Sequence, residues 1–264
     1  MIAAETMSAI PIVPRHAPRS SRPSRSRFLI PGLLLAGLVM PSVATGQDDR
    51  LLRSRDLAAE LPEPRLDYMG RRIAPTMGYA HAGWLIRDER EQEERCSLLL
   101  ANLGLRPGMT VCDLGCGNGF HALQIANLVG DQGRVLAVDV QPEMLDLLRT
   151  RMAKSDVGNV TPILGSYHDP HLPESSCDLI LMVDVYHELG YPERMLSAMR
   201  KALKPDGLIA LVEFRAEDPD VPILPLHKMS KEQIMREYRP NGFRLDREFD
   251  ELPWQHLMFF GKDE

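Results

Sequence analysis

The stretch VCDLGCGNGF, residues 111–120, decides the fold. A short apolar run ends at Leu114, and a helix-like segment begins near Phe120. Three glycines alternate with other residues between them: Gly115, Gly117 and Gly119. Because glycine has no Cβ, a ligand can approach the backbone of such a loop and face the positive end of the following helix. The stretch therefore predicts a strand, a ligand-binding loop and a helix.

The spacing around this loop indicates which kind of ligand fits. Asp139 follows Gly119 by twenty residues, at the end of the next apolar run, where an acid can accept both hydroxyls of a ribose. The dinucleotide pattern GxGxxG would need a glycine at position 120, which is Phe120. Asp113 adds a carboxylate that disfavours a pyrophosphate and favours a cation. S-adenosylmethionine is a cationic nucleoside without phosphate. It therefore fits both the missing third glycine of the dinucleotide pattern and the carboxylate of Asp113.

Outward from the loop, short apolar runs alternate with helix-like segments. We expect strands at 109–114, 134–140, 160–164, 178–183 and 207–214, then Phe243–Phe249 and His256–Phe260. Helices are expected near 120–129, 142–154, 191–203 and 230–238, and one further helix over 85–100. This alternation predicts an α/β fold with a parallel sheet and helices on both faces.

Charge is unevenly distributed along the 264 residues. The chain has a net charge of −6, and residues 1–46 contribute +4, so the remainder carries −10. Nucleic-acid affinity comes mainly from Lys and Arg that neutralise phosphates. The acidic body therefore argues against nucleic acid as a partner.

The N-terminus has the features of an export signal. A basic stretch precedes a 13-residue apolar run from Phe28 to Met40, and the small residues Ala44-Thr45-Gly46 follow. The run is shorter than the ~20 residues that a membrane-spanning helix needs. We expect residues 1–46 to be a signal peptide or a disordered basic arm. The protein is then periplasmic or secreted if the signal is real and cytoplasmic otherwise, with no stable membrane span in its mature form.

DLGCGNG, followed by an acid that ends the next strand, resembles motif I and its successor in class I S-adenosylmethionine-dependent methyltransferases. The resemblance extends from Cys96 to Phe260 and includes SSCDLILMVDVYHEL and LKPDGLIALVEF. It implies a Rossmann-like, doubly wound, mostly parallel seven-stranded sheet with an antiparallel last strand and an N-terminal helical cap. It also implies S-adenosylmethionine as cofactor and methyl transfer to a small-molecule acceptor by in-line displacement.

The resemblance divides the chain into three parts: residues 1–46, a helical cap or lid over 47–95, and a methyltransferase domain over 96–264. Residues 69–94, together with VDVYHEL, also resemble a group of bacterial methyltransferase-domain proteins, several of which carry export signals. This second likeness supports the predicted fold more than it indicates a particular function. No motif indicates the acceptor or an oligomeric state.

The resemblance also implies a set of cofactor contacts. The three glycines would line the methionine half, Asp113 would hold its ammonium group and Asp139 would take the ribose hydroxyls. Ser166 and Tyr167 stand where the family usually carries an acid or an amide. The remaining expected contacts are Cys116, Asn118, Val140, Gln141 and Asp184.

Three residues after the fourth strand are candidates for the catalytic group: Tyr186, His187 and Glu188. They could recognise the acceptor or take its proton, histidine being the usual choice near neutral pH. The alternative is that His187 and Glu188 only begin a helix. No metal site is predicted, since the run His168-Asp169-Pro170-His171 is typical of a loop.

Two other functions remain open from the sequence. An exported, non-catalytic protein that binds S-adenosylmethionine or a nucleotide could share this fold. An NAD-dependent oxidoreductase is disfavoured by Phe120 and Asp113.

Overall fold

The computed structural model describes residues 61–264. The expected signal peptide or arm, and the first part of the expected cap, lie outside the described residues. From Leu61 onward, no helix is both long and apolar enough to cross a membrane.

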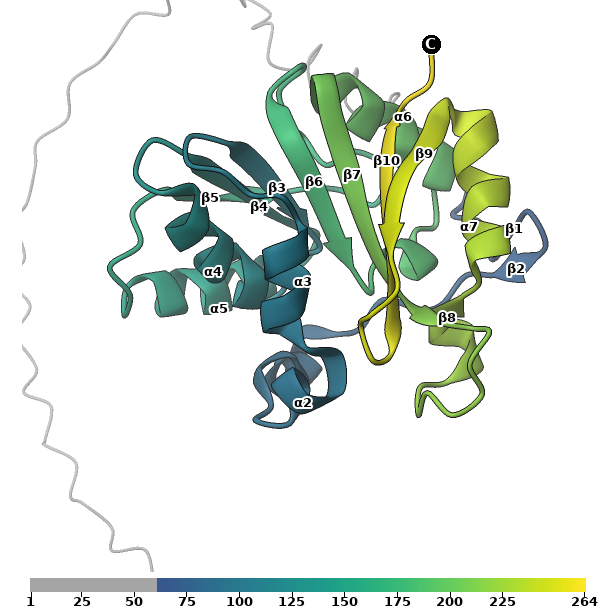
Figure 1. Cartoon of the computed structure of the whole chain (residues 1–264), viewed down its shortest axis with the longest axis horizontal. Coiled ribbons are helices and arrows are strands. Elements are labelled where there is room, and N and C mark those ends of the chain that lie inside the picture. The colour runs from purple at the N-terminus through teal and green to yellow at the C-terminus, as the bar shows by residue number, and fades with distance from the viewer. Residues whose placement is uncertain (1–60) are drawn as a thin grey trace, which may run out of the picture. The chain divides into compact units, whose positions relative to one another are not determined.

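A single large sheet organises the domain (Figure 1). Its main strands are β3 (Thr110–Leu114), β4 (Arg134–Asp139), β5 (Val160–Leu164), β6 (Cys177–Val183), β7 (Leu203–Arg215), β9 (Phe243–Phe249) and β10 (Gln255–Lys262). They lie in the order β5-β4-β3-β6-β7-β10-β9. The strands from β5 to β7 are parallel, and β10 is antiparallel to both β7 and β9. The predicted mostly parallel sheet with an antiparallel last strand is confirmed.

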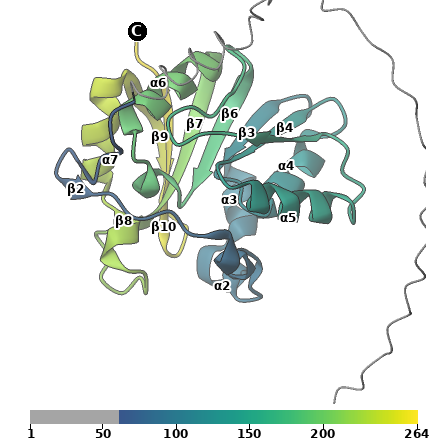
Figure 2. The ribbon, with the colours of Figure 1, turned by 180° about the vertical axis from the view of Figure 1, so that it is seen from behind.

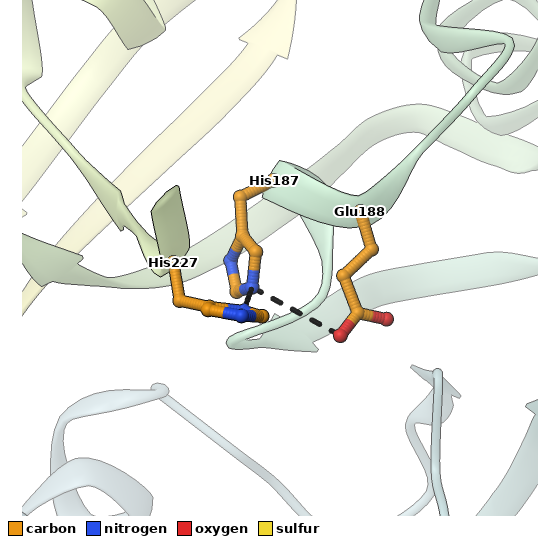
Figure 3. A group of neighbouring side chains, drawn as sticks. All are labelled: His187, Glu188 and His227. Atoms are coloured by element: carbon orange, nitrogen blue, oxygen red, sulfur yellow. Dashed lines mark hydrogen bonds and ion pairs between the residues drawn. The ribbon is translucent and has the colours of Figure 1, made fainter. Parts of the chain in front are cut away.

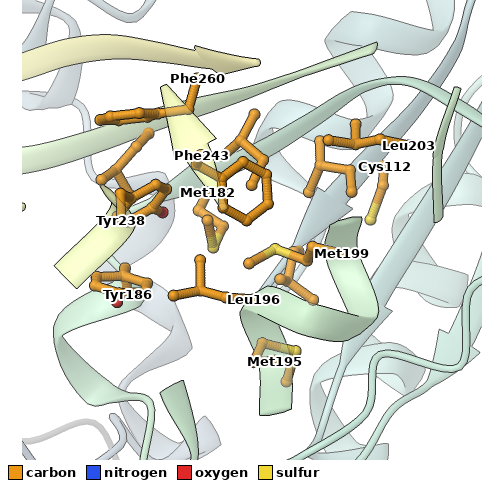
Figure 4. Close-up of a cluster of buried hydrophobic side chains, with 14 of the residues drawn as sticks. Cys112, Met182, Tyr186, Met195, Leu196, Met199, Leu203, Tyr238, Phe243 and Phe260 are labelled. Atoms are coloured by element: carbon orange, nitrogen blue, oxygen red, sulfur yellow. The ribbon is translucent and has the colours of Figure 1, made fainter. Parts of the chain in front are cut away.

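Helices cover both faces of this sheet (Figures 1 and 2). One face carries α3 (Cys96–Asn102), α4 (Phe120–Val129) and α5 (Pro142–Met152), and the other carries α6 (Pro192–Ala202) and α7 (Lys231–Tyr238). Successive side chains of a strand point to opposite faces, so each strand supplies two cores. In β6, Leu179 and Leu181 pack with α3 to α5, whereas Ile180 and Met182 pack with α6 and α7 (Figure 4).

The helix boundaries follow from local chemistry. Both α5 and α6 begin with proline, which is preorganised for the first helical position, and both carry acids in the first turn and basic residues in the last. Helix α7 is capped by Ser230, whose Oγ accepts a hydrogen bond from the Gln233 backbone N–H at 3.1 Å.

The N-terminal part differs from the predicted single helix over 85–100. A small hairpin of β1 (Asp67–Tyr68) and β2 (Arg71–Arg72) comes first, then a 3-10 helix, η1 (Tyr79–Ile86), and a short helix α2 (Arg90–Glu94). Arg95 has a φ of +51°, which ends α2 and lets α3 leave in a new direction. We call residues 61–95 the N-terminal strap.

Smaller differences occur near β7. Strand β7 starts at Leu203, before the predicted start at 207, and its register against β6 is irregular. A two-residue strand, β8 (Lys228–Met229), pairs with the end of β7 as an eighth strand. Three short 3-10 turns complete the described elements: η2 (Tyr186–Glu188), η3 (Pro225–His227) and η4 (Arg239–Asn241).

Gly119 holds α4 close to α5. Its φ is +80°, and a Cβ there would lie 2.3 Å from Leu148 Cδ1. We expect Gly119→Ala to lower the free energy of unfolding by about 2–5 kcal/mol, because the left-handed backbone costs about 1–2 kcal/mol and overpacking adds about 1–3. Urea denaturation at 25 °C measures the change.

Gly108→Ala is the matched control. Gly108 has a φ of +87°, and nothing lies within 4 Å of an added Cβ there. Its substitution by alanine should therefore cost only the free energy of the left-handed backbone. Equal destabilisation by both substitutions would show that the contact with Leu148 is not restrictive.

Candidate functional site

Four adjacent parallel strands bring one acid each to the carboxyl edge of the sheet. Asp139 ends β4, Asp113 lies near the end of β3, Asp184 directly follows β6, and Glu213 lies near the end of β7. We call these four residues the carboxyl row. Ligands of open α/β sheets bind at this edge, where the strand order reverses.

The glycine loop follows β3 at the same edge. Gly115 and Gly117 have φ values of +74° and +52°. An added Cβ would lie 2.5 Å from Val185 Cγ2 at Gly115 and 2.6 Å from Leu85 Cδ1 at Gly117. The loop therefore requires glycine at both positions, as predicted from its sequence.

A cavity of about 430 Å³ lies against this edge. Many of the predicted site residues line it: Gly115, Gly117, Asp139, Val140, Gln141, Ser166, Tyr167, Asp184, His187 and Glu188. Residues of the N-terminal strap line it too: Thr76, Met77, Trp84, Leu85 and Arg90. The glycine loop and the loop after β6 thus share one cavity with the strap.

Five predicted residues do not line this cavity: Asp113, Cys116, Asn118, Gly119 and Tyr186. The Cys116 backbone N–H donates to Val138 O at 2.9 Å, and its side chain is buried. The Asn118 amide donates to Ala82 O at 2.9 Å. These two residues shape the loop and hold the strap.

Tyr186 is a correction to the predicted catalytic group. Its side chain is fully buried and packs 5.0 Å from the Tyr238 ring, in the core beneath α6 and α7 (Figure 4). Successive side chains of the tight η2 turn point in different directions, so the turn buries Tyr186 while His187 and Glu188 line the cavity.

Asp139 is preorganised by backbone donors. Its two carboxylate oxygens accept hydrogen bonds from the Gly117 and Gln141 N–H groups, both at 2.9 Å. Burial raises the pKa of Asp139, and these N–H groups oppose that rise. The side chain therefore stands at the end of β4 in a fixed orientation, facing the cavity.

The Gln141 side chain joins the strap to the sheet edge. Its Nε2 donates to Met77 O and its Oε1 accepts from the Tyr79 N–H, each at 2.9 Å. Glu188 adds a bond, since its Oε1 accepts from the Met77 N–H at 3.2 Å. Trp84 of the strap is 40% exposed and lines the cavity.

Two members of the carboxyl row have oxygens without a donor. Asp113 is buried, and its Oδ2 has no hydrogen-bond partner. Asp184 has a φ of +55°; its Oδ2 accepts from Gln255 Nε2 at 3.0 Å, while its Oδ1 is buried without a partner. Burial raises the pKa of Asp113 to about 7 and that of Asp184 well above its usual value.

A histidine group occupies another part of the cavity wall (Figure 3). His187 Nδ1 lies 2.6 Å from Glu213 Oε2, and His187 Nε2 lies 3.0 Å from His227 Nδ1. Glu188 Oε1 is 4.0 Å from His187 Nε2.

The pKa values within this group shift in different directions. Burial opposes protonation of His187, but Glu213 outweighs it, and the pKa of His187 is raised. Burial raises the pKa of Glu188 to about 7. Burial and the neighbouring His187 lower the pKa of His227.

Sequence reasoning missed several of these residues. Glu213 was detectable as the only acid in the apolar stretch LIALVEF, residues 208–214. Arg90, Gln255 and His227 belong to no motif, and only the fold brings them to the carboxyl edge.

Comparison with known proteins identifies the class. Residues 105–252 match the family described as "Methyltransferase domain". A crystal structure of a SAM-dependent methyltransferase from Aquifex aeolicus has 25% sequence identity and a TM-score of 0.66, and the match covers 70% of this chain and 98% of that one. The described domain is therefore a class I S-adenosylmethionine-dependent methyltransferase domain.

The chain belongs to this methyltransferase-domain family, whose cofactor is S-adenosylmethionine. A curated relative from Shewanella sediminis (strain HAW-EB3) is named ubiquinone/menaquinone biosynthesis C-methyltransferase UbiE. It is 30% identical over 123 residues, which is 46% of this chain and 49% of the relative. The chain thus spans about half the length of the curated relatives it matches.

The site fits this cofactor. Asp184 lines the cavity, and its Oδ1 without a hydrogen-bond partner suits a ligand with positive charge. The glycine loop beside it leaves no room for a Cβ. A pyrophosphate would instead meet the carboxyl row, which disfavours the NAD-dependent alternative.

The raised pKa of Asp113 predicts a pH-dependent stability. The folded carboxyl, facing Arg90 and Asp139, titrates at about 7, whereas in an unfolded chain it titrates near ~4. Its contribution to stability is full below about pH 4 and is lost as pH rises through 7. Asp113→Asn, isosteric with the protonated acid, should gain stability over wild type as pH rises from about 4 to about 7, by at most about 1.4 kcal/mol per pH unit, with little further change above that range.

Urea denaturation at several pH values measures this difference. Asp146→Asn, which changes an exposed carboxyl on α5, should give a difference that does not vary with pH. A flat profile for Asp113→Asn would contradict the assignment.

Proposed function

We propose that this chain transfers a methyl group from S-adenosylmethionine to a small-molecule acceptor by in-line displacement. One observation carries the proposal: a single cavity is lined both by the glycine loop with Asp139 and by His187, Glu188 and an apolar wall. Donor and acceptor can therefore meet in one cavity. A cavity of about 430 Å³ lies in the ordinary range for small-molecule sites.

The cofactor supplies an electrophilic methyl group on a sulfonium. The chain's own residues bind and orient it: Asp139 accepts hydrogen bonds from the ribose hydroxyls, and Asp184, which lines the cavity, faces its positive charge. Asp113 lies behind the cavity wall and acts on the cofactor only through its charge. Methyl transfer needs no protein nucleophile, and holding the reactants in line can lower the barrier by ~7–11 kcal/mol.

The acceptor side of the cavity is mostly apolar. Its lining includes Met195, Phe214, Pro222, Ile223 and Leu224. These residues favour an acceptor with an apolar body that fits between them and the strap. The name of the UbiE relatives, which refers to ubiquinone and menaquinone biosynthesis, agrees with a small acceptor of this kind. The acidic body of the chain supports an acceptor other than nucleic acid.

Calorimetric titration of the full chain with S-adenosylmethionine, S-adenosylhomocysteine and NAD tests cofactor binding. We expect the first two to bind at micromolar concentrations and NAD not to bind. Asp139→Asn should weaken binding about 10- to 100-fold, because hydrogen bonds to a charged group contribute ~1.5–3 kcal/mol. Asp146→Asn on the exposed side of α5 is the matched control and should bind as wild type.

Transfer of an isotopically labelled methyl group to a panel of apolar hydroxy, thiol and amino compounds tests turnover. We expect wild type to form labelled product from at least one compound. At limiting cofactor concentration, Asp139→Asn should form none. Cofactor binding without any turnover would favour the non-catalytic binding protein instead. Preference for NAD would contradict both.

The pattern of residues 1–46 supports export as a further part of this proposal. Mass spectrometry of the protein recovered outside the cytoplasm should find a chain that begins near Gln47. An uncleaved chain confined to the cytoplasm would contradict it.

A further inference from the structure

The structure brings two histidines and a glutamate together on the cavity wall: His187, Glu188 and His227. We propose that they bind a divalent transition metal ion, Zn²⁺ being the natural probe, and that this ion holds the methyl acceptor. The second part rests on the proposed methyl transfer. The first part stands independently.

The spacing of the three groups suits one ion. Their ligand atoms all lie within 4.8 Å of one another. Nε2 of His187 is 3.0 Å from Nδ1 of His227 and 4.0 Å from Oε1 of Glu188. Tetrahedral zinc bonds of about 2.0–2.1 Å place neighbouring ligand atoms about 3.3 Å apart. The two His187 distances differ from this spacing by less than ~1 Å, and the remaining pair lies within 4.8 Å, so side-chain adjustments of about 1 Å reach this geometry (Figure 3).

Glu213 supplies the support that a metal-binding histidine needs. Its carboxylate is fully buried in β7 and contacts Nδ1 of His187 at 2.6 Å, while its other oxygen accepts from the His187 backbone N–H at 3.2 Å. Metal-binding histidines almost always donate their second ring N–H to such a carboxylate or carbonyl. The contact fixes the ring and directs Nε2 toward His227 and Glu188. It also explains an acid inside an apolar strand, where burial is otherwise costly.

The ligand set resembles a catalytic site more than a structural one. Structural zinc sites are closed by four protein ligands, whereas catalytic sites use three, such as two histidines and a glutamate, and keep a position open. Here the three ligands lie on the wall of the same cavity as the glycine loop. The open position therefore faces the space that an acceptor enters.

This arrangement selects an acceptor with a hydroxyl or thiol group. Coordination to the ion lowers the pKa of that group, and its proton leaves to solvent. The oxygen or sulfur then forms a bond to the cofactor's methyl carbon as the carbon–sulfonium bond breaks, and the electron pair stays on the departing sulfur. The products are the methylated acceptor, the neutral thioether and one proton.

Zinc binding by the metal-free full chain, followed by calorimetry, tests the site. We expect one Zn²⁺ to bind at micromolar or lower concentration. His227→Ala should weaken this binding more than about 100-fold, since loss of a supporting residue alone costs 10- to 100-fold. Glu213→Gln should fall within that smaller range. His171→Ala, which removes an exposed histidine remote from the three ligands in sequence, is the matched control and should bind as wild type.

Cobalt provides a second readout that needs no activity. Co²⁺ bound to wild type should give the intense visible absorption of a four- or five-coordinate ion, absent in His227→Ala. Glu188→Gln is nearly isosteric, so it provides a test of the site even if His227→Ala fails to fold. It should weaken Zn²⁺ binding at least ~10-fold.

The outcomes separate the two proposals. S-adenosylmethionine should bind His227→Ala within ~3-fold of wild type, because His227 is not among the expected cofactor contacts. Zinc affinity unchanged in both His227→Ala and Glu188→Gln, or no binding to wild type, would overturn the metal site while leaving methyl transfer intact. Zinc binding without any cofactor binding would overturn the methyltransferase proposal and leave the metal site intact.

Discussion

Burial of the carboxyl row is the constraint on which the rest of the site depends. Four acids at the ends of adjacent strands repel one another, and each needs donors to remain away from water. The chain supplies different donors along the row: backbone N–H groups for Asp139, the amide of Gln255 for Asp184, and His187 for Glu213. The supply is incomplete, since two oxygens of the row have no donor. Asp184 carries one of these two oxygens and lines the cavity, so a cationic ligand fits beside it.

The N-terminal strap is attached through the same polar edge. Arg90 donates to the buried Glu94 at 2.9 Å and to Leu85 O at 2.7 Å, so one side chain ties α2 to the end of η1. Glu94 in turn accepts from Arg87 at 2.6 Å and from Gln255 at 3.3 Å. Breaking a buried pair of this kind leaves an uncompensated charge, so the strap and the sheet edge stabilise one another.

Much of the fold was predictable, because its signals are local. The glycine loop, the alternating strands and helices, and the proline-led starts of α5 and α6 each depend on residues close in sequence. The single helix predicted over 85–100 is wrong, since the chain breaks at Arg95, where the neighbouring Glu94 makes buried contacts that no short window of sequence contains. The side-chain direction of Tyr186 likewise depends on packing against α7. His227 joins His187 only through the return of the chain after β7, so periodicity and motifs gave no sign of it.

The donor-free oxygens of Asp113 and Asp184 also determine what binding does to protons. Burial raises the pKa of Asp113 to about 7 and also raises the pKa of Asp184, so both carboxyls hold protons more readily than an exposed carboxyl does. A cation that enters the site lowers both pKa values and expels protons. Binding of the cationic cofactor is therefore coupled to the release of protons. The heat of binding then varies with the ionisation enthalpy of the buffer.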